Sequence, residues 1–136
     1  MLPRLPIRLL LAALLVASLA ACGGSRALAG TWSLSGVQGI PTPSGGTFVI
    51  TFTSDGKVSG QSGCNTYSGS YTVNGQAIVF GPLAATKKAC AAPLMTVETA
   101  YLTALQLVNA WQINDGTLTL SGPGGRPILT YTNNQG

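Results

Sequence analysis

The chain has 136 residues, 46% of them apolar and only 7% charged, with a formal net charge of +4. This length suits a single folded domain with a real hydrophobic core. The basic residues are scattered apart from Lys87-Lys88, which excludes nucleic-acid binding as a main function. The chain has no histidine, which excludes nucleophile activation of the Ser-His or Cys-His kind.

The N-terminus carries the clearest signal in the chain. Arg4 and Arg8 precede an apolar run over residues 9–20. This run has about a dozen residues, whereas a membrane-spanning helix needs roughly 20. A basic start, an apolar stretch and small residues indicate a removable export signal. The run ends in Leu19-Ala20-Ala21-Cys22, which resembles the lipobox of bacterial lipoproteins.

This resemblance implies that residues 1–21 are cleaved off and that Cys22 carries lipid in the cell envelope. The open alternative is an ordinary secretory signal that is cleaved near Ala21 and leaves Cys22 unmodified. Residue 23 is Gly rather than Asp, so the resemblance implies the outer membrane, facing the periplasm, if the source is Gram-negative. We expect residues 22–28 to form the lipidated cysteine and a flexible tether. The five basic and three acidic residues after position 21 leave a net charge of +2.

Residues 30–80 alternate between apolar and polar side chains, which indicates half-buried antiparallel strands. The clearest case is residues 47–53, where Phe48, Ile50 and Phe52 share one face. Asn74-Gly75 is a strong signal for a tight hairpin. The alternation predicts strands at residues 32–34, 47–53, 57–62, 67–73 and 76–80.

Residues 94–110 contain no Gly or Pro and change to a helical period. The apolar positions of this segment are Leu94, Val97, Tyr101, Leu105 and Val108. Their spacing of three and four predicts an amphipathic helix of about four turns. Pro93 bounds its start, with Thr96 as the expected N-cap. Glu98 then lies in the first turn, where the helix dipole favours a negative charge.

The segment after this helix returns to strands. Residues 111–114 and 117–121 flank the turn Asp115-Gly116, and a Gly-Pro-rich loop at 122–127 leads to a last strand at 128–132. The chain therefore predicts an α+β fold, a curved antiparallel meander sheet of about seven or eight short strands packed on one α-helix inserted before the last strands. The expected organisation is a signal peptide at 1–21, lipidated cysteine and tether at 22–28, a domain at 29–132 and a tail at 133–136.

Two cysteines remain once Cys22 is assigned to lipid. In an oxidising compartment the pair Cys64 and Cys90 predicts a disulfide, worth roughly 3–4 kcal/mol of stability in the chain-entropy model. The alternatives are a free reactive thiol and a metal site. Two cysteines without histidine do not complete a zinc shell, so we expect no metal and no cofactor.

Residues 59–71, with the segments that follow, resemble the META domain family, also called HslJ-like. The matching landmarks are Trp32, Gly63, Cys64, Asn65, Tyr67, Gly69, Tyr71, Thr86, Cys90, Met95 and Glu98. The resemblance covers about residues 29–132. It implies a small α+β domain of the cell envelope, often lipid-anchored and sometimes linked to heat or antibiotic stress, for which no enzyme activity is established.

The motif can also be interpreted from its residues alone. Gly63 and Gly69 interrupt strands, which indicates a bulge or a close approach of backbone. Asn65 tolerates the left-handed backbone region and can bond its own backbone. Tyr67, Gly69 and Tyr71 share one strand face, so Gly69 is expected to leave room for a cross-strand aromatic ring. These roles favour a structural function of the motif over ligand binding.

The carboxylates of the chain do not suggest catalysis. Asp55 and Asp115 precede glycines in turns, and only Glu98 remains. Without a pair of acids for glycoside chemistry or a histidine, we expect no enzyme activity and no catalytic residue.

Three kinds of non-catalytic function stay open. The leading hypothesis is a lipid-anchored envelope domain, monomeric apart from its membrane attachment, that supports stress tolerance. The second is a pilot-like lipoprotein that binds acyl chains or a partner peptide between sheet and helix, where Leu102 and Leu107 either make contact or simply widen the buried face. The third is an inhibitor or accessory subunit of an envelope enzyme, which would use the loops at 36–46 or 81–93.

Overall fold

The computed structural model describes residues 23–38 and 45–133, with side chains from residue 26 onward. Cys22 and the signal segment lie outside the described residues. The elements are α1 (Gly23–Leu28), β1 (Gly30–Val37), β2 (Thr47–Phe52), β3 (Lys57–Gly63), β4 (Thr66–Asn74), β5 (Ala77–Phe80), β6 (Ala84–Ala85), α2 (Ala92–Leu107), β7 (Ala110–Asn114), β8 (Thr117–Ser121), the 3-10 turn η1 (Pro123–Gly125) and β9 (Pro127–Asn133).

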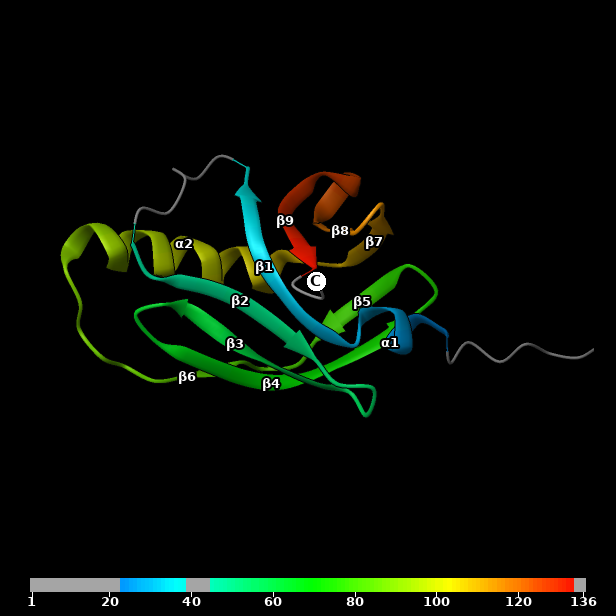
Figure 1. Cartoon of the computed structure of the whole chain (residues 1–136), viewed down its shortest axis with the longest axis horizontal. Coiled ribbons are helices and arrows are strands. Elements are labelled where there is room, and N and C mark those ends of the chain that lie inside the picture. Colours follow the sequence, from blue (N-terminus) through cyan, green and yellow to red (C-terminus); the bar gives the residue numbers. More distant parts are fainter. Residues whose placement is uncertain (1–22, 39–44, 134–136) are drawn as a thin grey trace, which may run out of the picture.

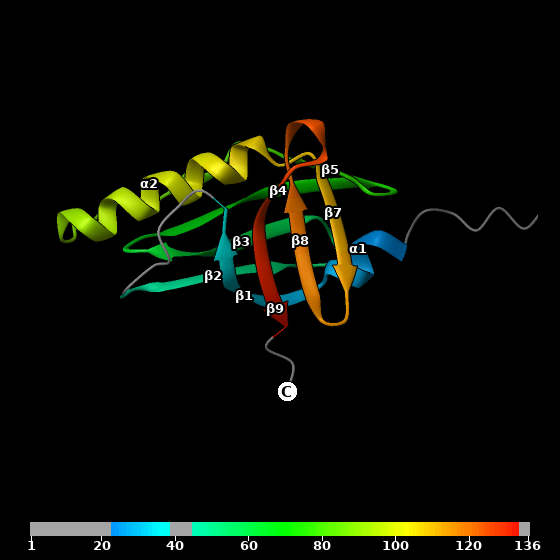
Figure 2. The same cartoon turned by 90° about the horizontal axis from the view of Figure 1, so that it is seen from above.

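The strands form one antiparallel sheet that closes on itself (Figures 1 and 2). Its order is β3-β2-β1-β9-β8-β7-β5-β4-β6, and β3 also pairs with β4. Eight strands therefore make a closed barrel, and β6 pairs with β4 along the same edge as β5. The sequence predicted a curved meander sheet, and its closure into a barrel corrects that prediction. Alternation shows which face of a strand is buried, but not which strand lies beside it.

Two of the strand pairs in the barrel differ greatly in length. Five residues from Lys57 to Gln61 pair with residues 66–70 across the β3–β4 hairpin. On the other side of β4 lies β5, which pairs with β7 through one pair of facing residues, Ala77 and Ala110. One flanking hydrogen bond, from the Ile78 N–H to the Asn109 carbonyl, measures 3.1 Å. The β5–β7 pairing is therefore the shortest strand pairing in the barrel.

Every predicted strand is present, β8 with the predicted bounds and the others with slightly different ones, and the short β6 was not predicted. The predicted turns are also present. Asp115 adopts a φ of 47° in the β7–β8 turn, a left-handed conformation that a short polar residue tolerates. Antiparallel strands and one long helix thus agree with the predicted α+β class.

The long helix α2 begins and ends earlier than predicted. It starts two residues before Leu94, and Val108 is already extended. Ala91 occupies the N-cap position with no side-chain hydrogen bond, and Pro93 lies in the first turn, where its missing N–H is not needed. The prediction of Thr96 as N-cap is wrong, because its hydroxyl donates to the Ala92 carbonyl inside the helix at 3.1 Å.

The start of the described chain is more ordered than the predicted tether. Gly23–Leu28 forms α1, and Leu28 is completely buried in the core. The Leu28 carbonyl accepts a hydrogen bond of 2.8 Å from the indole N–H of Trp32. Residue 28 therefore belongs to the folded domain, which corrects the assignment of residues 22–28 to a flexible tether.

The interior of the barrel is apolar and aromatic. The buried apolar residues are Leu28, Trp32, Phe48, Ile50, Phe52, Val58, Tyr67, Tyr71, Ile78, Tyr101, Ala104, Leu105, Val108, Leu118, Leu120, Leu129 and Tyr131. Helix α2 contributes Tyr101 and Leu105 to this core, as its spacing predicted. Phe48 meets Tyr101 edge-on, with ring centroids 5.3 Å apart. None of the helices in the described residues is long and apolar enough to cross a membrane.

Candidate functional site

The motif residues gather where β3 turns into β4, next to the start of α2. Gly63 ends β3 with a φ of +98°, a conformation that glycine adopts without strain. A Cβ at this position would lie 2.8 Å from the Phe48 ring. The turn closes through the Ser62 N–H, which donates to the Asn65 carbonyl at 2.8 Å. Asn65 itself has no positive φ, so the left-handed role considered for it is wrong.

Asn65 and Glu98 form the centre of a buried polar cluster. The Asn65 backbone N–H donates to Glu98 Oε1 at 2.8 Å, and Asn65 Nδ2 donates to Glu98 Oε2, also at 2.8 Å. The Ser62 hydroxyl donates to Glu98 Oε1 at 2.5 Å. Ser62, Asn65 and Glu98 are 0%, 5% and 3% exposed. Three donors thus surround one carboxylate that is shielded from water.

The other side of Asn65 holds the loop between β5 and α2. Asn65 Oδ1 accepts from the Thr86 hydroxyl at 2.8 Å and from the Lys88 backbone N–H at 2.7 Å. Asn65 Nδ2 also donates to the Lys88 carbonyl at 3.2 Å. The Thr86 hydroxyl accepts in turn from the Thr66 N–H at 3.1 Å. We call Ser62, Asn65, Thr86, Glu98 and the Lys88 main chain the Asn65–Glu98 cluster.

The position of Glu98 differs from the predicted one. Counted from Ala92, Glu98 is the seventh residue of α2 and lies beyond the first turn. Its carboxylate is held by donors from the β3–β4 turn, not by the helix dipole. The sequence contained a signal for one of these donors that the prediction missed. Ser62 shares the buried face of β3 with Val58, and a hydroxyl on such a face needs a partner.

The predicted disulfide between Cys64 and Cys90 is confirmed. It joins the β3–β4 turn to the residues just before α2, with 6.0 Å between the two Cα atoms. The disulfide and Asn65 therefore fasten the same loop at two adjacent places. The described residues contain no group of three or more His, Cys, Asp or Glu side chains that could hold a metal ion.

A chain of tyrosine hydroxyls crosses the barrel interior. Tyr67 donates to the Val49 carbonyl at 3.0 Å. Because each hydroxyl has one proton, Tyr101 then donates to Tyr67 at 3.0 Å and Tyr131 donates to Tyr101 at 2.9 Å. These three residues come from β4, α2 and β9. Burial is the main cause that raises the pKa of all three hydroxyls well above the usual tyrosine value. The three hydroxyls therefore stay protonated and neutral.

Gly60, not Gly69, accommodates an aromatic ring. A Cβ on Gly60 would lie 2.5 Å from the Tyr67 hydroxyl oxygen and 2.0 Å from the Val49 carbonyl oxygen. The missing side chain therefore lets Tyr67 reach across β3 to Val49. At Gly69, a Cβ would instead lie 2.8 Å from Leu83 Cδ2. The close approach predicted at Gly69 is present, but its neighbour is aliphatic.

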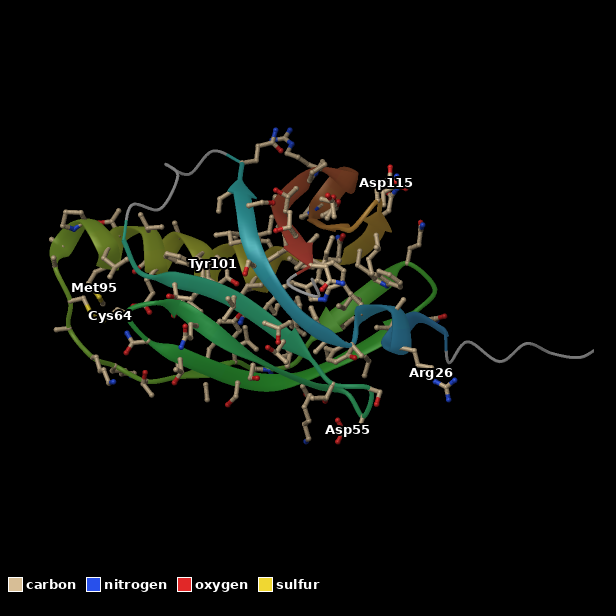
Figure 3. All side chains as sticks on the ribbon, viewed as in Figure 1. Arg26, Asp55, Cys64, Met95, Tyr101 and Asp115 are labelled. Atoms are coloured by element: carbon tan, nitrogen blue, oxygen red, sulfur yellow. A yellow bond between two sulfur atoms is a disulfide. The ribbon has the colours of Figure 1, made fainter. Side chains whose placement is uncertain are left out.

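The remaining motif residues are spread along the barrel. Trp32 packs in the core and bonds the Leu28 carbonyl. The Tyr71 hydroxyl donates to the Thr53 carbonyl at 2.6 Å, and its pKa is raised by burial and by the Asp55 carboxylate. Met95 lies near Cys64 at the disulfide end of the molecule (Figure 3). Thus the motif builds one polar cluster and several separate core contacts.

A shallow groove runs between α2 and the segment that contains β6. It has a volume of about 300 Å³ and is lined by Leu83, Ala85, Thr99, Leu102, Thr103 and Gln106. Leu102 is half-buried here, whereas Leu107, at the end of α2, is 52% exposed. The structure therefore separates the two leucines, since only Leu102 lines the groove.

Comparisons with known proteins give a family and a fold. The model of the META domain family matches residues 26–135. A protein from Burkholderia xenovorans, solved by NMR, is 27% identical and superposes with a TM-score of 0.65, covering 85% of this chain and 89% of its own. A second protein solved by NMR is 25% identical, with a TM-score of 0.60 over 78% of this chain and 90% of its own.

A third similar structure extends the fold comparison. The crystal structure of a DUF4847 family protein from Bacteroides vulgatus is 18% identical, with a TM-score of 0.57 over 80% of this chain and 95% of its own. This likeness concerns the fold alone. No curated protein matches the chain.

Proposed function

The chain belongs to the META domain family, and on that premise we propose that it is a non-catalytic domain of the cell envelope, anchored to a membrane by lipid on Cys22. Its role is to support envelope stress tolerance. The stress role is suggested by membership of this family, and the anchor by the sequence that ends at Cys22.

The observation that best supports a non-catalytic role is the saturation of the Asn65–Glu98 cluster. Glu98 is the one buried carboxylate among the described residues, and its two oxygens accept three hydrogen bonds from the protein. No buried side-chain N or O atom of the described residues lacks a hydrogen-bond partner. A general base must reach a substrate proton within about 3 Å, and this carboxylate could do so only after losing its contacts.

The anchor is supported by the sequence Leu19-Ala20-Ala21-Cys22 after a basic and apolar start. The disulfide between Cys64 and Cys90 is consistent with an oxidising compartment outside the cytoplasm. For a Gram-negative source we propose the outer membrane, because Gly23 follows the cysteine, where an Asp would favour retention in the inner membrane.

The test is a deletion strain of the source organism that is challenged with heat and with hydrophobic antibiotics. We expect lower survival and higher permeability, restored by the wild-type gene but not by a Cys22→Ala variant that keeps the domain and loses the anchor. Unchanged survival and permeability under both stresses would refute the stress role.

The groove beside α2 favours a second candidate function, the binding of an acyl chain or an apolar peptide. Its lining includes the apolar side chains Leu83, Ala85 and Leu102 and no charged side chain. Apolar surface in a concave site is typical of ligand pockets. The groove is small, so it suits a single extended chain.

Native mass spectrometry of protein extracted from membranes tests this second function. A bound lipid or peptide on the wild type that is lost in Leu102→Gln is the expected result. Leu107→Gln is the matched control, since Leu107 is exposed and does not line the groove. Equal spectra for all three proteins, without bound species, would rule the groove out as a binding site.

A further inference from the structure

We propose that one particular end of the domain faces the bilayer that holds the lipid. This end, the anchor end, consists of α1, the β2–β3 turn and the β4–β5 hairpin. The opposite end, with the Cys64–Cys90 disulfide and the start of α2, then faces away from the membrane. The inference rests on the proposed attachment through Cys22 and adds to it an orientation and a membrane-contact surface.

The first support is the short distance between the anchor and the core. Cys22 directly precedes α1 in the sequence, and α1 ends at Leu28, which is fully buried. Six residues of α-helix span about 9 Å, whereas six extended residues would reach about 20 Å. The helix therefore halves the available reach. The bond between Trp32 and the Leu28 carbonyl further fixes where the chain leaves the barrel.

The second support is the position of α1 in the molecule. Figures 1 and 2 show α1 beside the β4–β5 hairpin at one end of the long axis and the start of α2 toward the other end, where Figure 1 also places β6. Figure 3 places Arg26 and Asp55 at the α1 end and Cys64 and Met95 at the opposite end. Strand β3 connects the two ends, and its seven residues span about 20 Å. An anchor at α1 thus holds one end close to the lipid and the other away from it.

Side chains at the anchor end are compatible with contact to headgroups without insertion into the hydrocarbon. Arg26 and Lys57 are exposed there, and the exposed carboxylate of Asp55 in the same turn offsets part of their charge. Lys87 and Lys88 are exposed at the other end, so the orientation follows from the position of α1 and not from charge.

The lysines of the domain provide a built-in test. Lys57 begins β3, two residues after Asp55, and is exposed at the anchor end. Lys87 and Lys88 are exposed in the loop that Asn65 and the disulfide hold at the other end. The Debye length is about 10 Å at 0.1 M salt. A membrane surface that reaches Lys57 should therefore leave Lys87 and Lys88 unaffected.

The experiment measures how fast each lysine reacts with a membrane-impermeant amine reagent, using peptide mass spectrometry. Lipidated protein is inserted into vesicles that contain phosphatidylglycerol. A surface potential of roughly −30 mV lowers the fraction of unprotonated amine about threefold, and headgroup contact adds to this. We expect Lys57 to slow at least threefold relative to the Cys22→Ser protein mixed with the same vesicles, and Lys87 and Lys88 to keep their rates.

A linker variant provides the second arm. Insertion of a flexible Gly-Ser segment of about 20 residues between Gly24 and Ser25 gives a reach of about 25 Å. The protection of Lys57 should then disappear although the lipid remains. Equal slowing of all three lysines, stronger slowing of Lys87 and Lys88, or protection that survives the linker would overturn the orientation.

The intact mass of the protein tests the lipid attachment separately. If Cys22 proves to be bare, the proposed function fails, and the vesicle experiment proceeds with the Cys22 thiol coupled to a maleimide phospholipid. The orientation is then decided by the same lysine rates.

Discussion

The substitution Glu98→Gln tests whether the Asn65–Glu98 cluster is a structural element. The amide oxygen can keep the two hydrogen bonds at Oε1, from Ser62 and from the Asn65 N–H. The amide nitrogen then faces Asn65 Nδ2, a donor opposite a donor, where the wild type has a bond of 2.8 Å. Asn65 cannot flip to adapt, because its Oδ1 accepts from Thr86 and Lys88.

The size of the effect follows from these contacts. The hydrogen bond from Asn65 Nδ2 to the charged Oε2 is lost, and the new amide nitrogen at position 98 is buried without an acceptor. The two hydrogen bonds at Oε1 weaken because their acceptor becomes neutral. We expect a loss of about 3 kcal/mol in the free energy of unfolding, or a fall in Tm of about 10 °C for a domain of this size.

Urea and thermal unfolding followed by circular dichroism measure this loss. Asp115→Asn is the matched control, since it removes the same charge from an exposed turn and should change stability by less than about 0.5 kcal/mol. If Glu98→Gln changes stability no more than Asp115→Asn does, the cluster does not hold the fold together.

Three further predictions concern the core and the disulfide. Because the three buried tyrosines keep their protons in the folded state, the free energy of unfolding has its full value below about pH 10 and falls above it by roughly 4 kcal/mol per pH unit. The substitution Tyr131→Phe should reduce this slope by about one third in urea titrations between pH 9 and 11. Replacing both Cys64 and Cys90 by Ala should lower the free energy of unfolding by about 3 kcal/mol and leave the near-UV spectrum native, since Asn65 still holds the loop; loss of that spectrum at pH 7 would contradict the reasoning. Gly60→Ala should destabilise by about 3 kcal/mol, because its Cβ would meet the Val49 carbonyl; unchanged thermal unfolding would show that this close approach is not tight.

Much of the fold could be predicted from local patterns. The alternation around Phe48, Ile50 and Phe52 placed β2, and the Asn74-Gly75 signal placed the β4–β5 hairpin. The barrel closure could not be predicted in this way, because β1 pairs with β9 and β5 with β7, and these strands are far apart in the sequence. Strand β6 was missed because two alanines carry no alternation of their own.

The Asn65–Glu98 cluster could likewise be predicted only in part from the sequence. The sequence identified Asn65, Thr86 and Glu98 as motif residues, and it predicted the disulfide beside them. It misassigned Glu98 to a helix start, since the helix begins earlier than Thr96 suggested. It also placed Leu28 in a tether, because a single apolar residue after Gly23-Gly24 gives no sign that the core extends to it.

The most direct test of the whole account is the intact mass of the protein extracted from membranes with detergent. We predict a chain that begins at Cys22, heavier by its attached acyl groups and lighter by the two hydrogen atoms lost in the Cys64–Cys90 disulfide. A chain that begins at another residue, or one whose Cys22 carries no lipid, would contradict the central claim that this domain works at a membrane surface.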